Sequence, residues 1–369
     1  MRLGMFMMPV HPPARSFTDT LAEDEEKALY ADQLGFDELW LGEHFSATTE
    51  PIPSPLMYFA SLLSRTKNLK FGTGVICLPN HDPAIVAAEV AQFDHMSRGR
   101  FMLGIGPGGL LSDFELFGNA DRAVRARKTM EAVRIMQRIW AQDPPYDIAG
   151  EFRTVRLKEA IIPALGIGTM PKPFQRPGPP ITMSVSSRNS PTARVAGEQG
   201  WGILSGNNMP ANAVATHWQA YGKACATAGS HARSEDWRVA RNVMVAQSDA
   251  EARDRVFGDQ GSNRYFYTYM REVLSRVGIL SVMKPDPDMP DEKATVDVIT
   301  EGCVLYGSPQ TMLDKLVAFR DTVGPFGTLL MTGLDWSGPN REWERESMRL
   351  LAHDVMPKFR QHAMAQAAE

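Results

Sequence analysis

An acidic residue and a histidine stand side by side at the end of an apolar stretch. The stretch Phe36–Leu41 has the composition of a buried parallel strand, and Glu43 and His44 follow it after a single glycine. A histidine exchanges protons near neutral pH, and a neighbouring carboxylate can fix its tautomer or raise its pKa. The pair predicts a proton-transfer site, and the competing interpretation is a loop cap without chemistry.

A polar turn after another apolar run, Ile181–Val185, is a second candidate site. It precedes an expected helix that starts at Pro191, where N–H groups and the positive end of the helix dipole favour an anion. Hydroxyl, amide and guanidinium groups in the turn could hold a phosphate. These groups belong to Ser186, Ser187, Arg188, Asn189 and Ser190. The competing interpretation is an ordinary helix cap.

A glycine-rich segment, Gly104–Gly109, follows a further apolar run. It contains a GxG but lacks the full dinucleotide spacing, and Pro107 removes one N–H donor. Missing side chains would suit a flat ring lying against the backbone. The next expected helix carries the basic residues Arg122, Arg125, Arg127 and Lys128, of which one could face inward to share an anion.

Short apolar runs alternate with amphipathic segments along the chain, which is typical of repeated βα units. We expect eight strands, over Leu3–Met8, Phe36–Leu41, Leu69–Ile76, Phe101–Gly106, Ile181–Val185, Trp201–Leu204, Arg238–Ala246 and Phe326–Met331. The pattern predicts an α/β fold, a (β/α)8 TIM barrel with insertions. The active site of such a barrel lies at the C-terminal ends of its strands.

Helices are expected between these strands, over Thr18–Leu34, Pro55–Ser64, Asp82–Met96, Ala120–Trp140, Pro191–Gln199, Pro210–Thr227 and Arg341–Arg360. We expect Thr18 or Asp19 to cap the first and Asp82 the third. Residues 142–180 are expected to form an insertion packed on the barrel. Residues 250–307 are expected to form a lid or insertion, and the favoured interpretation of its aromatic cluster is helix packing. Residues 1–369 are taken as one domain.

The composition excludes several classes of function. A net charge of −4, without a dense basic run, argues against nucleic-acid binding. Cys77, Cys225 and Cys303 have neither disulfide nor zinc spacing, which predicts a reducing, cytoplasmic location and no metal. No signal peptide or membrane span is expected. Without a GxSxG elbow or an HExxH motif, the chemistry is expected to come from a bound cofactor.

In combination, several motifs resemble the bacterial luciferase-like flavin-dependent monooxygenase superfamily over nearly the whole chain. They are Leu3–Phe6, Gly35–His44, Leu69–Val75, Leu78–Pro79 with His81 and Pro83, Phe93–Phe101, Gly104–Gly108, Ala196–Glu198 with Gly200, Gly307–Gln310 and Asp354–Pro357. Gly106–Gly109 and Lys284–Asp288 look closer to limonene-type and diketocamphane-type monooxygenases than to luciferase.

The resemblance implies an enzyme that takes reduced FMN from a separate flavin reductase and uses O2 to oxygenate its substrate through a peroxyflavin. It also implies site residues. His44 matches the family's active-site histidine, with Glu43 beside it. Gly74 and Val75 match the pair that backs the flavin ring, often through a cis peptide. The remaining flavin-facing positions are Gly106, Pro107 and Gly108, and phosphate contacts would fall to Ser186–Ser190 and Arg127, with Arg125 the competing alignment.

The substrate is expected to be a lipophilic ketone, terpene or aldehyde. The candidate contacts are Met8, Phe45, Tyr58 and Trp336, although each of them could simply pack the barrel. By resemblance a homodimer is expected. One alternative is an oxidoreductase that uses the deazaflavin F420 for hydride transfer. Another is a non-catalytic, luciferase-like flavin-binding subunit, which would have no need of His44 with Glu43.

Overall fold

Every residue of the long strand β10 (Trp237–Val245) is buried, as a parallel strand covered on both faces requires. In this computed structural model, which describes the backbone of residues 1–368 and the side chains of residues 1–365, β10 pairs with three parallel neighbours. They are β9 (Gly202–Ser205), β11 (Val304–Gly307) and β12 (Thr328–Gly333). Strand β12 also pairs along its whole length with β1 (Arg2–Met7).

The chain forms two compact units. The first comprises Met1–Trp40, Thr48–Glu50 and Met183–Glu369, and the second comprises Leu41–Ala47 and Pro51–Thr182. Strands β2 (Glu38–Leu41) and β8 (Ile181–Val185) lie where the chain passes from one unit to the other.

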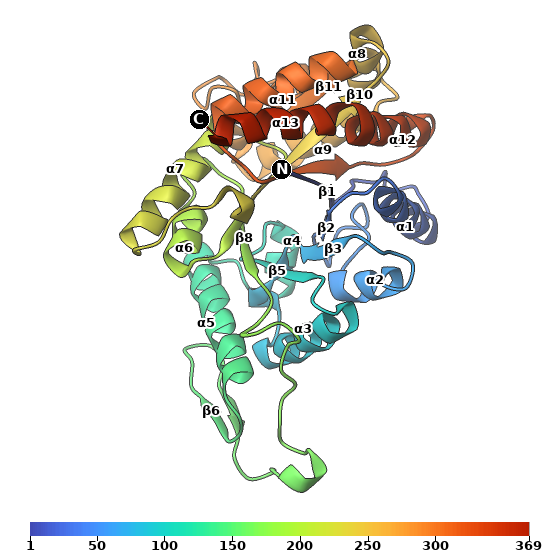
Figure 1. Ribbon diagram of the computed structural model, residues 1–369. Coiled ribbons are helices and arrows are strands. Elements are labelled where there is room, and N and C mark those ends of the chain that lie inside the picture. Colours follow the sequence, from blue (N-terminus) through green and yellow to red (C-terminus); the bar gives the residue numbers. More distant parts are fainter. Residues whose placement is uncertain (369) are drawn as a thin grey trace. The chain divides into compact units, whose positions relative to one another are not determined.

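The first unit surrounds its strands with helices, of which α11 and α13 lie side by side next to the C-terminus (Figure 1). Its α-helices are α1 (Phe17–Gln33), α6 (Pro191–Gln199), α7 (Ala211–Thr227), α8 (Asp249–Phe257), α9 (Ser262–Arg276), α10 (Val296–Cys303), α11 (Pro309–Val323), α12 (Asn340–Leu350) and α13 (Met356–Ala368). Short 3-10 turns cover Ser234–Asp236 and Leu280–Val282, and a π-helical turn, Leu351–Val355, joins α12 to α13.

The second unit contains β3 (Lys70–Thr73), β4 (Ile76–Cys77) and β5 (Phe101–Gly106), with both shorter strands parallel to β5. Its helices are α2 (Pro55–Leu62), α3 (Pro83–Ser97), α4 (Leu111–Leu116) and α5 (Arg122–Ala141), with 3-10 turns at Leu78–Asn80 and Pro163–Leu165. Strands β6 (Tyr146–Ile148) and β7 (Val155–Leu157) form a separate antiparallel hairpin.

Eight strands, each followed by at least one helix, make up the barrel in chain order: β1, β2, β3, β5, β8, β9, β10 and β12. The fold is therefore a (β/α)8 barrel, as the sequence predicted. Asp82 caps α3 as expected, because its carboxylate accepts the N–H groups of Ala84 and Ile85.

Three local expectations were wrong. The third strand is not continuous, because the Thr73 hydroxyl bonds both the N–H and the carbonyl of Gly104 and so replaces the backbone ladder. Helix α1 is capped by Ser16 and not by Thr18 or Asp19, because the Ser16 hydroxyl accepts the Asp19 N–H. Helix α4, directly after the glycine-rich turn, was not expected at all.

The stretch 250–307 is neither a linker nor structureless. It holds α8, α9, α10 and β11, and it has a buried cluster of its own that includes Phe266, Tyr267, Met283 and Ile299. The aromatic residues there pack a helix, which was one of the two interpretations. Strand β11 was missed because it is only four residues long and follows α10 without a break.

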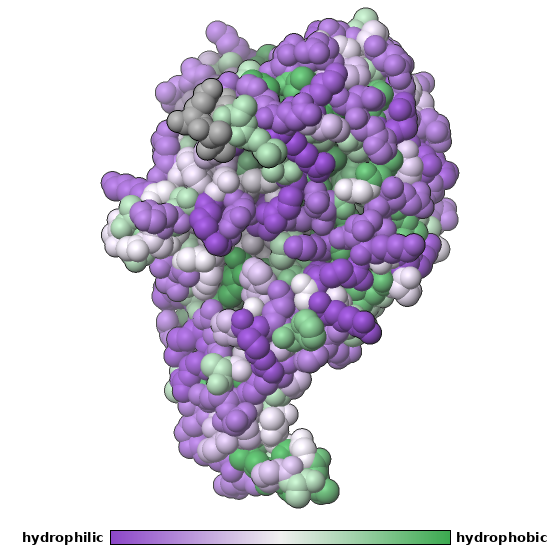
Figure 2. Space-filling view, in the orientation of Figure 1, coloured by the Kyte–Doolittle hydropathy of each residue, from purple (hydrophilic) through white to green (hydrophobic). Residues whose placement is uncertain are grey.

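The stretch 142–180 packs only in part, contrary to expectation. Tyr146 and Ile148 of β6 are fully buried, but Ile162, Leu165 and Ile167 are between 47% and 70% exposed. Figure 2 shows this apolar turn as the green patch at the foot of the molecule, where Figure 1 shows the turn that follows the hairpin. The exposed apolar side chains therefore belong to the turn after the hairpin, whereas the hairpin strand β6 is packed.

Candidate active site

His44 follows β2, and the second unit supplies its partner, the Asp113 side chain of α4. His44 Nδ1 lies 3.5 Å from Asp113 Oδ2. The same carboxylate accepts the backbone N–H groups of Phe45 at 3.3 Å and Ser46 at 3.0 Å. Asp113 therefore fixes both the backbone of the loop and the orientation of the histidine ring within it. An Nδ1–H bond to a carboxylate leaves Nε2 as the nitrogen that accepts a proton in the neutral ring.

Glu43, the acid expected to act with His44, turns its carboxylate elsewhere. Its Oε1 accepts the Cys77 N–H at 2.7 Å and lies 2.9 Å from His81 Nε2. Burial lowers the pKa of His81, but the hydrogen bond and the charge of Glu43 outweigh it, so that the pKa is raised overall. Burial also raises the pKa of the Cys77 thiol well above its ordinary value. That thiol is consequently protonated and a poor nucleophile.

The two predicted flavin-facing backbone segments lie at the ends of neighbouring strands in the second unit. Gly74 and Val75 lie between β3 and β4 and are joined by a cis peptide bond, as the resemblance implied. Gly106 ends β5, and Pro107 and Gly108 follow it. Gly108 has a φ of +85°, and a Cβ there would lie 3.0 Å from the Phe114 ring. The turn therefore requires glycine for its own packing.

The arginines of α5 have very different environments. Arg127 lies on the surface and pairs with Glu151 at 3.1 Å, with more than half of its side chain exposed. Arg125 is buried, and its guanidinium stacks on the Phe114 ring with 3.5 Å between its carbon and the ring centroid. One of its nitrogens donates to the carbonyls of Asn119 and Ala120, each at 2.7 Å. Burial, and then the charge of Arg122, lower the pKa of Arg125.

In the first unit, the polar turn Ser186–Ser190 joins β8 to α6. Ser190 caps α6 through its hydroxyl, so that the simple cap interpretation holds for that residue, and Asn189 adopts a left-handed conformation with φ +49°. Buried His217 supports the turn, with its Nε2 at 3.0 Å from the Ser187 carbonyl. Burial lowers the pKa of His217 to about 4, although its bond to Ser187 opposes the shift, and the ring is therefore neutral in the cell.

Arg188 of the same turn bonds to α7 and to the insertion that follows β10. Its Nη2 donates to Asn212 Oδ1 at 2.7 Å and to the carbonyls of Lys284 and Pro285 at 3.3 Å. These hydrogen bonds hold the Arg188 guanidinium against α7 and the insertion. The neighbouring turn residues Ser187 and Asn189 do not take part in them.

The predicted substrate-binding residues are spread over the two units. Phe45 packs edge-on against Phe117 and beside His81, and half-buried Tyr58 lies on α2. Met8, also half-buried, follows β1. Trp336 is only 3% exposed, and the Lys27 ammonium lies 5.0 Å from the centre of its ring. The Trp336 ring therefore packs against charged groups of the first unit.

Those charged groups form a buried network after β1 and β12 that the sequence did not suggest. His11 is 1% exposed, with Nδ1 at 2.7 Å from Asp335 and Nε2 at 3.1 Å from Asp24. Arg15 pairs with Asp335, and Lys27 lies 3.4 Å from Asp24. His11, Glu23 and Asp24 are close enough to share a metal ion, but Arg15 and Lys27 already neutralise the carboxylates.

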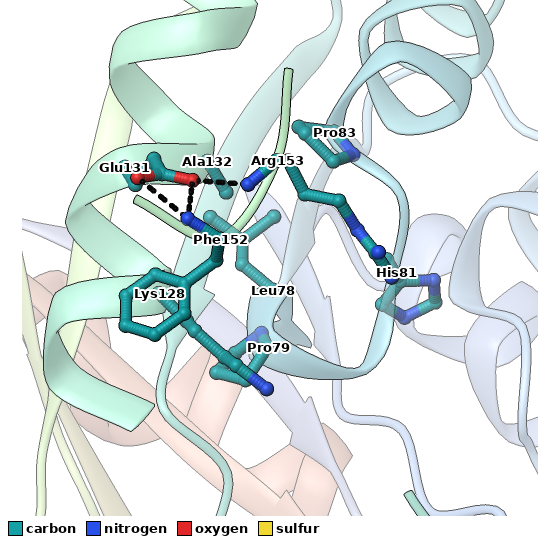
Figure 3. A pocket seen from close by; sticks show the side chains of 9 residues that line it. All are labelled: Leu78, Pro79, His81, Pro83, Lys128, Glu131, Ala132, Phe152 and Arg153. Carbon is teal, nitrogen blue, oxygen red and sulfur yellow. Dashed lines mark hydrogen bonds between the residues drawn. The ribbon is translucent and has the colours of Figure 1, made fainter. Parts of the chain in front are cut away.

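A cavity of about 180 Å³ lies in the second unit between α5 and the segment that follows β4. Figure 3 shows Arg153 reaching toward His81 on one side and Lys128 beside Phe152 on the other. The Glu131 carboxylate accepts the N–H groups of Phe152 and Arg153 and so fixes the wall of the cavity.

Comparison with known proteins identifies the family. The model of luciferase-like monooxygenases matches residues 1–324. The chain belongs to this family. It is 33% identical to 4-hydroxyprotoasukamycin monooxygenase of Streptomyces nodosus subsp. asukaensis, a match that covers 96% of this chain and 91% of the relative. It is 30% identical to limonene 1,2-monooxygenase of Rhodococcus erythropolis, over 96% and 86% respectively.

A solved structure shows the same fold in a luciferase-like monooxygenase. It is the oxygenating constituent of 3,6-diketocamphane monooxygenase from Pseudomonas putida, a type II Baeyer–Villiger monooxygenase in complex with FMN. The TM-score is 0.87 with 26% identity, over 97% of this chain and 98% of that one. The sequence resemblance to luciferase-like monooxygenases is thereby confirmed. In the described part of the chain no helix is long and apolar enough to cross a membrane.

In this luciferase-like monooxygenase, the sequence did not predict Asp113 as the partner of His44, His81 as the partner of Glu43, or His11 as the partner of Asp335. A signal existed for Asp113, because it lies only seven residues beyond the end of β5, on a short segment whose apolar residues Leu110, Phe114 and Phe117 recur at helical spacing. It would have been found by extending the search at each strand end into the following loop.

Proposed function

We propose that this protein is the oxygenase component of a two-component flavin monooxygenase that inserts one oxygen atom into a lipophilic small molecule. The observation that carries the proposal is the His44–Asp113 pair at the C-terminal end of a barrel strand, in a chain that belongs to the luciferase-like monooxygenases. The P. putida protein, which is named an oxygenating constituent and contains FMN, supports FMN as the cofactor. A separate reductase would supply the FMN in reduced form.

The residues fit a flavin mononucleotide. Its phosphate needs a cation that no carboxylate has neutralised, and within the described residues no carboxylate lies at ion-pair distance from buried Arg125. The Nε–H of Arg125 is buried without a hydrogen-bond partner in the described chain. This costs free energy unless a ligand accepts the hydrogen bond. We therefore prefer Arg125 to Arg127 as the phosphate arginine. Ser186, Ser187, Arg188, Asn189 and Ser190 stay predicted phosphate contacts, and Gly74, Val75 and Gly106–Gly108 stay predicted ring contacts.

Bound reduced FMN supplies two electrons, so that substrate, FMNH2 and O2 become oxygenated product, FMN and water. His44 handles the protons of this reaction. Asp113 holds its Nδ1–H, and Nε2 can then accept a proton from the reacting groups or return one as the ring changes charge. Phe45 and the other predicted apolar contacts would exclude water, which protects the oxygenation from unproductive release of hydrogen peroxide.

The function is tested by supplying the purified protein with FMN, a flavin reductase, NADH and 18O2. Cyclic ketones, terpenes and aldehydes are screened by mass spectrometry for a product that carries one 18O atom. If no substrate gains oxygen, while the deazaflavin F420 is bound and its hydride transferred, the chain is an F420-dependent oxidoreductase. Flavin binding without either reaction would instead indicate a non-catalytic subunit. Sedimentation velocity tests the proposed homodimer.

Replacement of Arg125 by glutamine is expected to weaken FMN binding roughly 10- to 100-fold, because a charge-assisted hydrogen bond contributes about 1.5–3 kcal/mol. The measurement is quenching of flavin fluorescence. Riboflavin lacks the phosphate, so that its affinity should not change. Arg127→Gln is the matched control on the same helix and should alter FMN binding less than about threefold. Equal losses in the two variants would contradict the assignment.

A further inference from the structure

His81 lies outside the predicted catalytic pair, yet it contacts the residues on both sides of His44. Its Nε2 lies 2.9 and 3.2 Å from the two carboxylate oxygens of Glu43, the residue before His44. Its ring lies 5.7 Å from that of Phe45, the residue after His44. The backbone of His81 is itself fixed, because its N–H donates to the carbonyl of Leu78.

The loop that carries His44 is thus held from two directions within the second unit. Asp113 holds its far end through the N–H groups of Phe45 and Ser46. Glu43 holds its near end, because its carboxylate connects the Cys77 N–H of β4 to His81. Two strand ends, those of β2 and β4, are therefore tied to each other through a single carboxylate, and His81 is the side chain that orients it.

The surroundings of His81 argue against a direct chemical role. About a quarter of its side chain is exposed, and it lines the cavity shown in Figure 3, where Arg153 reaches toward it. Its Nε2 is already bound to Glu43, and charged Lys128, Glu131 and Arg153 line the cavity beside apolar side chains, so that His81 does not face a purely apolar pocket. His81 acts on Glu43, and Glu43 acts on the loop.

We propose that His81 is a positioning residue of the monooxygenase site, which holds His44 in its working orientation through Glu43 and Phe45. This inference rests on the proposed function in one respect, namely that His44 handles the protons of the oxygenation. It also gives Glu43 a role other than proton transfer.

The physical reason is the burial of Glu43, which is 3% exposed. Without His81, its carboxylate would lose a donor and keep the N–H and the thiol of Cys77. A buried carboxylate with too few donors costs free energy, so that it either moves toward water or takes up a proton. Either change weakens the hydrogen bond from the Cys77 N–H to Glu43 and makes the loop that begins at Glu43 more mobile. A shift of about 1 Å in a catalytic group can cost 100-fold in rate.

The test compares His81→Phe, which keeps a ring against Phe45 but removes the bond to Glu43, with His81→Gln, which can still donate to it. Amide hydrogen exchange is measured without flavin or substrate. In His81→Phe we expect the amides of Cys77 and of residues 43–46 to exchange at least roughly 10-fold faster, because local opening controls their exchange. His81→Gln should recover most of the protection. Arg153→Gln, which lines the same cavity, is the control and should exchange like the wild type.

Steady-state kinetics then distinguish a positioning role of His81 from a role in stability alone. In His81→Phe we expect kcat to fall roughly 10-fold or more with KM for the substrate unchanged, and more hydrogen peroxide for each NADH consumed. If His81→Phe is too unstable to purify, Glu43→Gln tests the same connection and should change exchange and kcat in the same direction.

Unchanged exchange in His81→Phe would overturn the proposal, and so would faster exchange with the kcat and coupling of the wild type. The exchange experiment contains no flavin and no substrate. Its result therefore does not depend on whether the wild-type protein proves to be an oxygenase, and the failure of one proposal is not mistaken for that of the other.

Discussion

Replacement of His44 by alanine or asparagine is expected to lower the rate of oxygenated product roughly 10²- to 10⁴-fold, the usual contribution of a positioned acid or base. Flavin oxidation by O2 should continue, because the electrons come from the cofactor and not from the histidine. The variant should therefore release hydrogen peroxide in place of product. Product is measured by mass spectrometry and peroxide by a peroxidase assay, with the same reductase and the same FMN concentration.

The partner of His44 makes this prediction more specific. Asp113→Asn keeps one side-chain oxygen, which can still accept the Ser46 N–H, but it replaces the oxygen that accepts the Phe45 N–H and removes the negative charge beside His44 Nδ1. We expect a smaller loss of rate than in His44→Ala, on the order of 10-fold. His95→Gln is the matched control, since this exposed histidine contacts the Lys172 carbonyl and the Phe174 ring. If His44→Ala keeps the rate and coupling of the wild type, the role of His44 is wrong.

Replacement of His11 by glutamine is expected to lower the free energy of unfolding by about 3 kcal/mol at pH 6, because it removes one partner from a buried charged network. His11 lies between Asp24 and Asp335, with Glu23, Lys27 and Arg15 as the other charged groups around it. Burial lowers the pKa of His11, but its bonds to the two aspartates outweigh burial and raise it overall.

The sign of the pH dependence follows from that raised pKa. The folded protein binds the His11 proton more tightly than the unfolded chain, so that this contribution is complete below about pH 6.5 and is lost as the pH rises through the folded value. Burial raises the pKa of Glu344 in the same region to about 7, which also makes stability fall as the pH rises from about 4.5 to 7.

The Asp335 carboxyl determines how the stability changes at the acidic end of the pH range. Burial raises the pKa of its carboxyl, but hydrogen bonds from His11, Ser337 and Arg15 outweigh burial and lower it well below the ordinary value. This contribution is present above about pH 3.9 and is lost as the pH falls toward the folded value. Together the three groups favour the folded state most at about pH 4 to 4.5, because above that pH the Glu344 contribution is already being lost while those of Asp335 and His11 are still present.

Urea unfolding of the wild type and of His11→Gln at pH 6 and pH 8.5 measures this effect. The stability difference between the two proteins should shrink at the higher pH, where neutral His11 no longer attracts both aspartates. His95→Gln again serves as the control and should cost less than about 0.5 kcal/mol at either pH. A difference that is unchanged or larger at pH 8.5 would mean that His11 is neutral in the folded protein.

The residue pattern was sufficient to predict these strands and helices, because the two kinds of element differ in the spacing of their apolar residues and in the residues at their ends. Strands β5 and β8 and helix α6 have the bounds that the sequence indicated, and the Pro83 start of α3 follows from its Asp82 cap. Observed and predicted bounds differ where a side chain competes with the backbone for a hydrogen bond. The Thr73 hydroxyl interrupts the third strand in this way, and no residue pattern announces such a bond.

The two arginines of α5 show a signal that was present in the sequence. Thr129 and Ala132 are buried, four and seven residues after Arg125, so that helical spacing places Arg125 on the buried face. Arg127 is two residues further along and points to another side of the helix. The family alignment favoured Arg127, whose side chain is exposed, because it compared positions without their helical phase.

The sequence by itself determined the barrel, the family and the location of His44 at a strand end, because these depend on the order and period of residues along the chain. Only the tertiary structure decided which groups act together. Asp113, and not adjacent Glu43, became the partner of His44, while Glu43 joined His81 and Cys77. Successive residues after a strand point in different directions, and hydrogen bonds form between groups that folding brings within about 3 Å, whatever their separation along the chain.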